Sequence, residues 1–127
     1  MLGTDSSKPI YIQIAEWLEN EILEGAISAN EKVYSQYQLA EIFNINPATA
    51  GKGLTLLLEK EIVYKRRGLG MFVSEDGRDK LLSERTSAIL EKQIMNLLEE
   101  AKRLQIDYEQ LLALLDKAYR GQGGNGK

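Results

Sequence analysis

The sequence contains no cysteine and no histidine among its 127 residues. This excludes disulfide bonds, zinc sites of the usual kind, thiol nucleophiles and acid–base catalysis by an imidazole. No apolar run reaches the length of about 18 residues that crosses a membrane. Residues 1–5 show no basic region followed by an apolar one, so a signal peptide is not expected. These absences predict a cytoplasmic protein with no membrane partner, no metal and no cofactor.

Recognisable catalytic groups are also lacking. Carboxylates, lysines and tyrosines are present, but none forms a known catalytic constellation, so an enzyme is not expected. Hydrophobic residues make up 43% of the chain, which is enough to build a core and argues against wholesale disorder. The length fits one ordinary domain, or a small domain with an appendage.

The charge balance is acidic overall and basic in one stretch. The net charge is −3, whereas most nucleic-acid-binding domains are basic. Residues 44–72, however, hold five Lys or Arg against two Glu, a local balance of +3. Phosphates respond to charge within a Debye length of about 8–10 Å, so one basic face can bind DNA on an acidic body.

Residues 46–60 read as a helix that could enter a DNA major groove. Asn46 is a good N-cap and Pro47 suits the first helical position. The open side would carry Ala48, Thr49, Gly51 and Lys52, and the buried side would carry Leu54, Leu57 and Leu58. Small polar groups and one cation, anchored by leucines, fit a recognition helix.

Two glycines weaken this helix, each costing about 1 kcal/mol relative to alanine. Their presence indicates that something approaches the backbone closely. For Gly53 we expect packing against another helix. For Gly51, packing and close approach of DNA both remain open.

A shorter helix is predicted just before the helix at residues 46–60. Ser35-x-x-Gln38 is a capping box, which satisfies two otherwise unpaired backbone donors. The residues expected to face inward are Leu39, Ala40, Ile42 and Phe43. Residues 44–46 form a turn, with Ile45 directed to the core. Helix, tight turn and helix together predict a helix-turn-helix motif.

An amphipathic helix opens the chain after Pro9, and residues 1–8 read as a frayed end. Its apolar positions are Ile10, Tyr11, Ile14, Trp17, Leu18 and Ile22, and the polar positions largely opposite are Gln13, Glu16, Glu19, Asn20, Glu21 and Glu24. Gly25 is a natural end for it. Trp17 could stack on a base, but its spacing favours the core. Residues 26–34 connect onward, with Ile27 and Val33 inward.

Residues 62–73 predict a β-hairpin, because two β-prone runs flank a glycine-containing turn. Lys65, Arg66 and Arg67 crowd that turn. Beside a helix-turn-helix such a hairpin is a wing that meets DNA, although a solvated charge run is the alternative. Gly68 and Gly70 are expected to adopt positive φ.

The remainder is helical. We place a DNA-binding domain at residues 1–76, a helical segment at 77–120 and a flexible tail at 121–127. A long helix over 79–105 carries a heptad seam of Leu90, Ile94, Leu97, Ala101 and Leu104. Asp107-x-x-Gln110 is a second capping box, and it begins a last helix over 108–119.

Two such helices cannot bury their large aliphatic side chains by themselves, so they need a partner. A second copy of the chain is the simplest partner, although packing back on the wing is the alternative. The residues expected at the dimer interface are Leu82, Ile89, Leu90, Ile94, Leu97, Leu98, Leu111 and Leu115. A two-fold dimer would place two recognition helices about one turn of DNA apart, which predicts an inverted-repeat site.

At this point the motifs identify a family. Residues 8–73 resemble the winged helix-turn-helix domain of the GntR superfamily of bacterial transcription regulators. The matching motifs are Pro9-Ile10-Tyr11-x-Gln13-Ile14, Ile22-x-x-Gly25, Ser35-x-x-x-Leu39-Ala40, Ile45-Asn46-Pro47-x-Thr49-x-x-Lys52-Gly53-Leu54 and Arg67-Gly68-x-Gly70-x-Phe72-Val73. The short helical tail resembles the YtrA-like branch, whose members lack a large effector domain and are often encoded beside ABC transporters. The resemblance implies a mainly α fold with a small hairpin, dimeric operator binding and repression.

The resemblance also transfers DNA contacts, with two departures. Many relatives carry Pro-Ser-Glu-Arg where this chain has Tyr34-Ser35-Gln36-Tyr37, and many carry arginine where it has Pro47. Two cationic contacts are thus missing. The candidate DNA-binding residues are Ser35, Gln36, Tyr37, Asn46, Pro47, Ala48, Thr49, Gly51, Lys52, Arg66, Arg67 and Gly68.

A second hypothesis is a regulator that senses a lipophilic small molecule between the C-terminal helices and the wing. This hypothesis is based on the aliphatic-rich tail, which has Tyr108 and Tyr119 nearby. A segment of about 50 residues leaves little room for a dedicated pocket of several hundred Å³.

Overall fold

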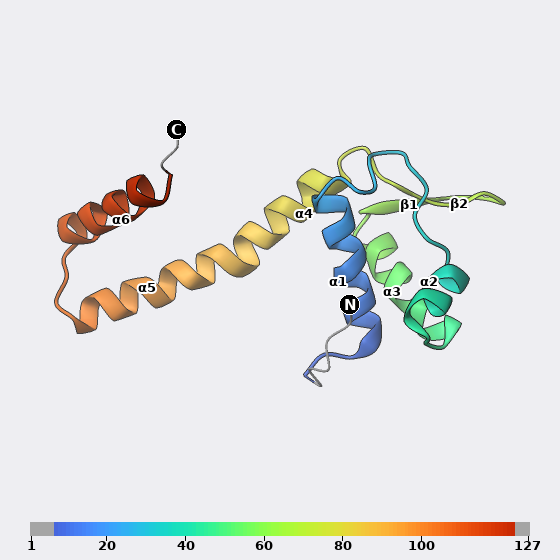
Figure 1. Cartoon of the computed structure of the whole chain (residues 1–127), viewed down its shortest axis with the longest axis horizontal. Coiled ribbons are helices and arrows are strands. Elements are labelled where there is room, and N and C mark those ends of the chain that lie inside the picture. Colours follow the sequence, from blue (N-terminus) through green and yellow to red (C-terminus); the bar gives the residue numbers. More distant parts are fainter. Residues whose placement is uncertain (1–6, 124–127) are drawn as a thin grey trace. The chain divides into compact units, whose positions relative to one another are not determined.

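The computed structural model describes residues 7–123, and the chain divides into two compact units, Met1–Glu84 and Arg85–Lys127 (Figure 1). The first unit holds four helices and a two-stranded antiparallel hairpin, and the second holds the remaining helices. This is the mainly α fold with a small hairpin that the sequence predicts.

Helix α1 (Ile10–Leu23) forms one wall of the core of the first unit. It follows Pro9 and ends before Gly25, which has a φ of +86° as the C-terminal signal predicts. Ile14, Leu18 and Ile22 are almost completely buried. Two expectations are wrong. Ile10 is 40% exposed, and Glu19, expected on the polar side, is only 3% exposed.

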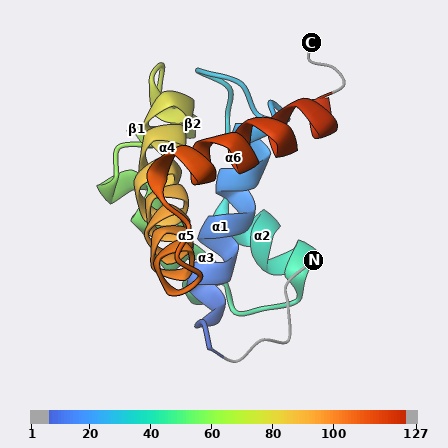
Figure 2. The same ribbon diagram turned by 90° about the vertical axis from the view of Figure 1, so that its left-hand side faces the viewer.

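The helix-turn-helix consists of α2 (Gln36–Phe43) and α3 (Pro47–Glu59), and α3 packs against both α1 and α2 (Figure 2). Ser35 and Gln38 form the predicted capping box. Asn44 takes a left-handed conformation, which lets the chain turn sharply between the helices. Leu39 and Ala40 are buried as expected, but Ile42 is 43% exposed.

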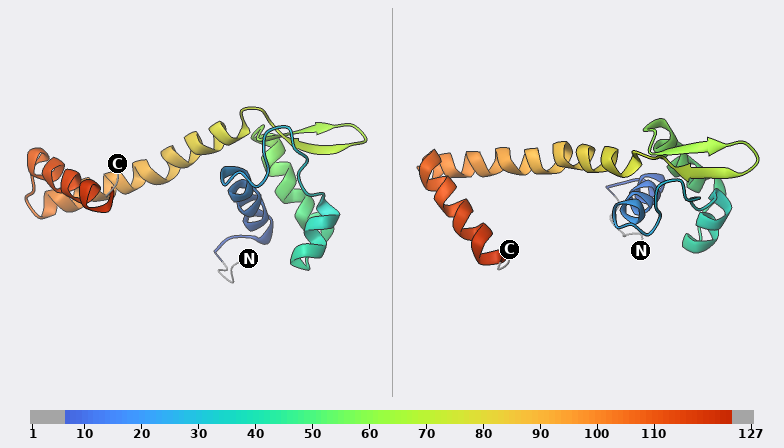
Figure 3. Two further views of the ribbon diagram at one scale, coloured as in Figure 1. Left: turned by 45° about the horizontal axis from the view of Figure 1, so that its top comes forward. Right: turned by 90° about the horizontal axis from the view of Figure 1, so that it is seen from above.

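The hairpin comprises β1 (Val63–Arg66) and β2 (Gly70–Val73), paired from Val63↔Val73 to Arg66↔Gly70. Figure 3 shows it projecting beyond the helices of the first unit. Gly68 and Gly70 have φ values of +77° and +119°, which confirms that the turn needs positive φ. The connector lies along β2, because the Val33 N–H donates to the Met71 carbonyl at 2.9 Å and Lys32 bridges Phe72.

A further helix, α4 (Gly77–Arg85), completes the first unit. Leu81 is fully buried in the same core cluster as Ile14 and Leu57. Contacts of this kind bring residues up to Glu84 into the first unit, which therefore extends beyond the boundary expected near residue 76.

In the second unit, a π-helical segment η1 (Thr86–Leu90) runs into α5 (Glu91–Arg103), and α6 (Tyr108–Gly123) follows. Asp107 and Gln110 form the predicted capping box at the start of α6. Figure 3 shows α6 turning away from α5 at the intervening loop. Residues 121–123 are helical, contrary to the tail expected there, and residues 124–127 lie outside the described part, as do residues 1–6 of the expected frayed end.

The long helix expected over 79–105 is thus present as α4, η1 and α5, with a π-helical interruption that the heptad pattern does not reveal. Lys8, expected in the frayed end, pairs with Glu16 at 3.0 Å. Among residues 7–123, no helix is both long enough and apolar enough to cross a lipid bilayer.

Candidate nucleic-acid interface

The first turn of α3 presents the predicted recognition surface. The Ala48 N–H donates to the Asn46 side-chain oxygen at 2.7 Å, which confirms Asn46 as the N-cap, and Pro47 occupies the first helical position. Asn46, Pro47, Ala48 and Lys52 are exposed, and Thr49 is half-buried. The opposite side of α3 carries Ala50, Leu54 and Leu57, which are buried and hold the helix on the core. The exposed set is free to meet a DNA groove.

The two glycines of α3 have different surroundings. A Cβ atom built on Gly53 would lie 2.9 Å from the Tyr11 carbonyl oxygen, so Gly53 permits close packing of α3 on α1, as predicted. A Cβ built on Gly51 would have the Gln36 side chain as its nearest neighbour, at 3.4 Å. Packing therefore requires glycine at residue 53 and does not require it at residue 51.

Gln36 lies between the two helices of the motif. Its side-chain amide donates to the Pro47 carbonyl at 3.4 Å, and the residue is half-buried. Gln36, a candidate DNA-binding residue, thus also holds the start of α3 against α2. Ser35 is likewise engaged, since its hydroxyl caps α2.

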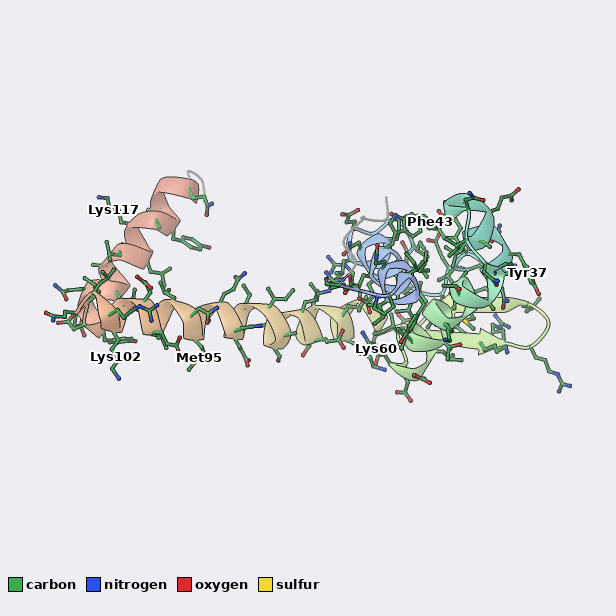
Figure 4. All side chains as sticks on the ribbon, turned by 90° about the horizontal axis from the view of Figure 1, so that it is seen from below. Tyr37, Phe43, Lys60, Met95, Lys102 and Lys117 are labelled. Atoms are coloured by element: carbon green, nitrogen blue, oxygen red, sulfur yellow. The ribbon has the colours of Figure 1, made fainter. Side chains whose placement is uncertain are left out.

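Lys52 and Tyr37 are the outward groups at the edges of the motif. The Lys52 nitrogen lies 5.3 Å from the centre of the Tyr11 ring, a distance at which a cation is attracted to the face of an aromatic ring. Tyr37 is 70% exposed and its side chain points away from the core (Figure 4). An exposed phenol can donate one hydrogen bond to a phosphate but brings no positive charge.

The wing carries its cations outward. Lys65, Arg66, Arg67 and Gly68 are all exposed. The Arg66 guanidinium lies 5.6 Å from the centre of the Phe72 ring, and Phe72 stacks on Tyr64 with ring centres 5.8 Å apart. Tyr64 in turn donates to the Asn30 side-chain oxygen at 3.0 Å. This chain of contacts orients Arg66 on the strand that leads to the turn.

Sequence reasoning missed a cation at the wing. Lys32 is exposed, forms an isolated β-bridge with Phe72, and its Cε would lie only 2.9 Å from a Cβ at Gly70. Lys32 therefore adds a fourth positive charge to Lys65, Arg66 and Arg67. A short irregular connector has no periodicity that could have placed it there.

Lys60 contributes less to the basic face than its sequence position indicates. Its nitrogen pairs with Glu19 at 2.9 Å and with Glu84 at 3.2 Å. Desolvation alone would lower its pKa, but the hydrogen bonds and charges of these two carboxylates outweigh that effect and raise the pKa of Lys60 above its ordinary value. Its charge is therefore compensated within the protein.

The residues expected at a dimer interface lie mostly in the second unit, and their side chains are uncovered. Leu90 and Ile94 are each 52% exposed and Leu115 is 54% exposed, whereas Leu111 is half-buried. The other expected interface residues, Leu82, Ile89, Leu97 and Leu98, are 42–45% exposed. Among the described residues of this unit, Ala101 alone is buried.

The helix-turn-helix and its hairpin define a winged helix-turn-helix protein. Comparison with known proteins identifies the family to which it belongs. No family model matches the chain. The HTH-type transcriptional repressor YtrA of Bacillus subtilis (strain 168) is 31% identical over 106 residues, which cover 84% of this chain and 81% of YtrA. A GntR family transcriptional regulator from Listeria monocytogenes is 33% identical, with a TM-score of 0.65 over 89% of this chain and 97% of that one.

The DNA-binding domain of AraR, solved in complex with operator ORR3, is 27% identical, with a TM-score of 0.52 over 58% of this chain and 89% of that one. The chain belongs to the GntR family of transcription regulators, and it resembles YtrA over most of both sequences. This confirms the family that the motifs indicate.

Proposed function

We propose that this protein is a cytoplasmic repressor that binds an inverted-repeat operator as a homodimer. The observation that carries the proposal is the Asn46-capped α3, which presents Ala48, Thr49 and Lys52 beside a wing rich in exposed cations. An α-helix fits the major groove, where side chains read base edges, and cations beside it neutralise phosphates. The AraR complex with operator DNA supports the same use of a similar domain.

Within this interface, roles follow from side-chain chemistry. The Ala48 methyl can contact a thymine methyl, and Lys52 can reach a guanine or a phosphate. Arg67, with Gly68 at the turn, would contact the DNA backbone or minor groove, and Ser35 and Tyr37 would contact phosphates. Without the two family arginines, we expect the wing cations to supply a large share of the affinity.

Dimerisation is proposed through the second unit. Its exposed aliphatic side chains recur along η1, α5 and α6, and this much exposed apolar surface supports an interaction site there. A second copy of the same chain supplies a self-complementary partner. The similarity to YtrA, a transcriptional repressor, supports repression, and the YtrA-like resemblance points to an ABC transporter operon as the target.

Selection of bound sequences from random duplex DNA tests the proposal. We expect a two-fold symmetric site with half-sites about one helical turn apart. Lys52→Ala and Arg67→Ala should each weaken binding roughly tenfold and lower the slope of log affinity against log salt by about one. Lys92→Ala, a matched exposed lysine in the second unit, should leave affinity unchanged. Wild-type protein without preference over random duplex would refute the proposal.

The lipophilic-sensor hypothesis invokes the same exposed aliphatic groups with a different occupant. A thermal-shift screen separates the two. Stabilisation by a lipophilic compound at a fixed protein concentration would favour a ligand, whereas a melting temperature that rises with protein concentration alone would favour the dimer.

A further inference from the structure

Lys32 lies in the connector between α1 and α2, where the backbone is hydrogen-bonded to β2 on either side of it. The Val73 N–H donates to the Glu31 carbonyl oxygen at 2.9 Å, and the Val33 N–H donates to a β2 carbonyl oxygen at the same distance. Lys32 itself bridges Phe72. These contacts fix the backbone of Lys32 against the wing.

The bridge also determines which face of the wing carries the Lys32 side chain. Residues directly opposite each other in antiparallel strands lie on the same face, and so do residues two apart on one strand. Lys32 is opposite Phe72, Phe72 is opposite Tyr64, and Arg66 follows Tyr64 by two residues. The stacking of Phe72 on Tyr64 and the Arg66 guanidinium near the Phe72 ring agree with this placement. Lys32 and Arg66 are therefore two cations on one face of the wing.

The stem of the Lys32 side chain rests on Gly70. A Cβ atom built on Gly70 would lie 2.9 Å from the Lys32 Cε and 3.7 Å from its Nζ. Gly70 pairs with Arg66 at the end of the hairpin next to the turn, so the Lys32 side chain extends from Phe72 toward that turn. A side chain held in this way loses less conformational freedom on binding than one that moves freely.

Lys32 is also close to the start of α2. It precedes Ser35, the N-cap of that helix, by three residues, which span at most about 11 Å of extended chain. A hollow of about 500 Å³ is lined by Lys32 together with Glu31 and, from α2, Gln38. The Glu31 carboxylate accepts a hydrogen bond from the Ser28 N–H at 2.7 Å. Lys32 thus lies between the start of α2 and the wing turn, the two places where we propose phosphate contacts.

The lysines of the first unit differ in whether a carboxylate compensates their charge. Three of them pair with Asp or Glu side chains, namely Lys8, Lys60 and Lys80. Within residues 7–123, no ion pair forms at the other three, namely Lys32, Lys52 and Lys65. Lys52 and Lys65 belong to α3 and the wing, so Lys32 shares its uncompensated charge with the lysines of the candidate interface. Such a lysine can neutralise a phosphate without first breaking an ion pair.

We infer that Lys32 is a further DNA contact, which binds a backbone phosphate between those bound by the start of α2 and by the wing turn. The inference rests on the proposed function, because it needs DNA on this side of the protein. Phosphate contacts position a protein on the duplex and carry no sequence information directly. Lys32 should therefore raise the affinity for operator and random duplex by the same factor, and it should release about one counterion from either.

The test uses the full chain, a duplex chosen by selection from random DNA, and a random duplex of equal length, each titrated over roughly 50–200 mM salt. Lys32→Gln should weaken binding to both duplexes roughly threefold to tenfold and lower the slope of log affinity against log salt by about one. The ratio of the two affinities should stay within about twofold of the wild-type ratio.

Two further variants isolate the position of the charge. Lys32→Arg keeps the charge and should retain the wild-type affinity and slope within about twofold, which separates a lost charge from an altered fold. Lys80→Gln is the matched control, because it makes the same change of net charge at a lysine that pairs with Glu61 and Asp76. It should bind both duplexes within about twofold of wild type.

An unchanged affinity and slope in Lys32→Gln, with wild type bound to its selected site, would overturn the inference alone. An equal loss in Lys80→Gln would also overturn it, since net charge would then account for the effect. A loss confined to the selected duplex would overturn the assignment to a phosphate. Wild type without preference for the selected duplex would refute the proposed function instead, and the titrations with random duplex would still decide on Lys32.

Discussion

The side-chain nitrogen of Lys60 lies 2.9 Å from a carboxylate oxygen of Glu19, and Glu19 is only 3% exposed. A buried carboxylate is costly unless it is paired, because desolvation removes its hydration. Lys60 caps the C-terminus of α3, and Glu19 lies in the middle of α1. The ion pair therefore joins the candidate recognition helix to the core helix beneath it.

Replacing Lys60 should weaken the fold. Lys60→Met keeps the aliphatic stem and removes the charge, which deprives Glu19 of this ion pair. We expect a loss of about 1–2 kcal/mol in the free energy of unfolding, less than for a fully buried pair because Lys60 is itself part-exposed. Urea unfolding of the wild type and of Lys60→Met measures this loss in the free energy of unfolding. Lys8→Met, which removes the exposed pair with Glu16, is the control and should cost under about 0.5 kcal/mol.

The same pair predicts a dependence on alkaline pH. The pKa of Lys60 is raised in the folded state, so the folded state favours its protonated form. The stabilisation is complete below the ordinary lysine pKa of about 10.4 and is lost as pH rises through the higher folded value. The difference in unfolding free energy between wild type and Lys60→Met should stay constant from about pH 7 to 9 and shrink above about 10.5. A difference that widens there would contradict the assignment.

Local hydrogen-bond chemistry made much of this architecture predictable. The capping boxes at Ser35 and Asp107, the N-cap at Asn46 and the glycine turn of the hairpin each depend on residues within three or four positions of one another. Such contacts are encoded in short stretches of sequence. The exposed start of α3 followed directly from them.

Long-range contacts explain what was missed. The buried side of α1 is Ile14, Ala15, Leu18, Glu19 and Ile22, rotated from the predicted side toward Glu19. A glutamate reads as a surface residue unless its partner is known, and Lys60 lies 41 positions away. The attachment of α4 was missed for the same reason, since Leu81 and Leu82 are adjacent in the sequence and only the fold shows that Leu81 is the buried one. At the candidate site, Lys32 reaches the wing through the long-range pairing of its connector with β2, which includes the bridge to Phe72.

Two neighbouring glycines of α3 should respond oppositely to alanine. Gly53→Ala would place a methyl 2.9 Å from the Tyr11 carbonyl oxygen and should destabilise the protein by about 1–3 kcal/mol through overpacking. Gly51→Ala has room, because the three atoms nearest to the added Cβ all belong to the flexible Gln36 side chain and lie at 3.4–3.5 Å, and should stabilise by about 0.5–1 kcal/mol through helix propensity. Thermal or urea unfolding decides both.

Gly51→Ala also separates folding from binding. A variant at least as stable as wild type that binds the operator several-fold more weakly would support close approach of DNA at this residue. Unchanged binding would assign the glycine no role at the DNA. Destabilisation by Gly51→Ala would contradict the space that the structure leaves at this position.

Charging the seam of α5 should separate the subunits. Leu97 is 45% exposed and shares the seam with Ile94 and Leu90. Leu97→Glu would bury two like charges near each other at a two-fold interface, so we expect dimer dissociation to become at least roughly tenfold more favourable. Analytical ultracentrifugation measures this over a range of concentrations.

Leu97→Glu should also weaken binding to the operator. A monomer loses the gain from binding both half-sites, so operator affinity should fall by about 10²- to 10⁴-fold while affinity for a single half-site is kept. Asn96→Glu adds the same charge one residue away, about 100° around α5 from Leu97 and off the heptad seam, and should leave the dimer and its operator affinity intact. A Leu97→Glu protein that remains dimeric would place the interface elsewhere, because a charge cannot be accommodated at a buried seam without a partner.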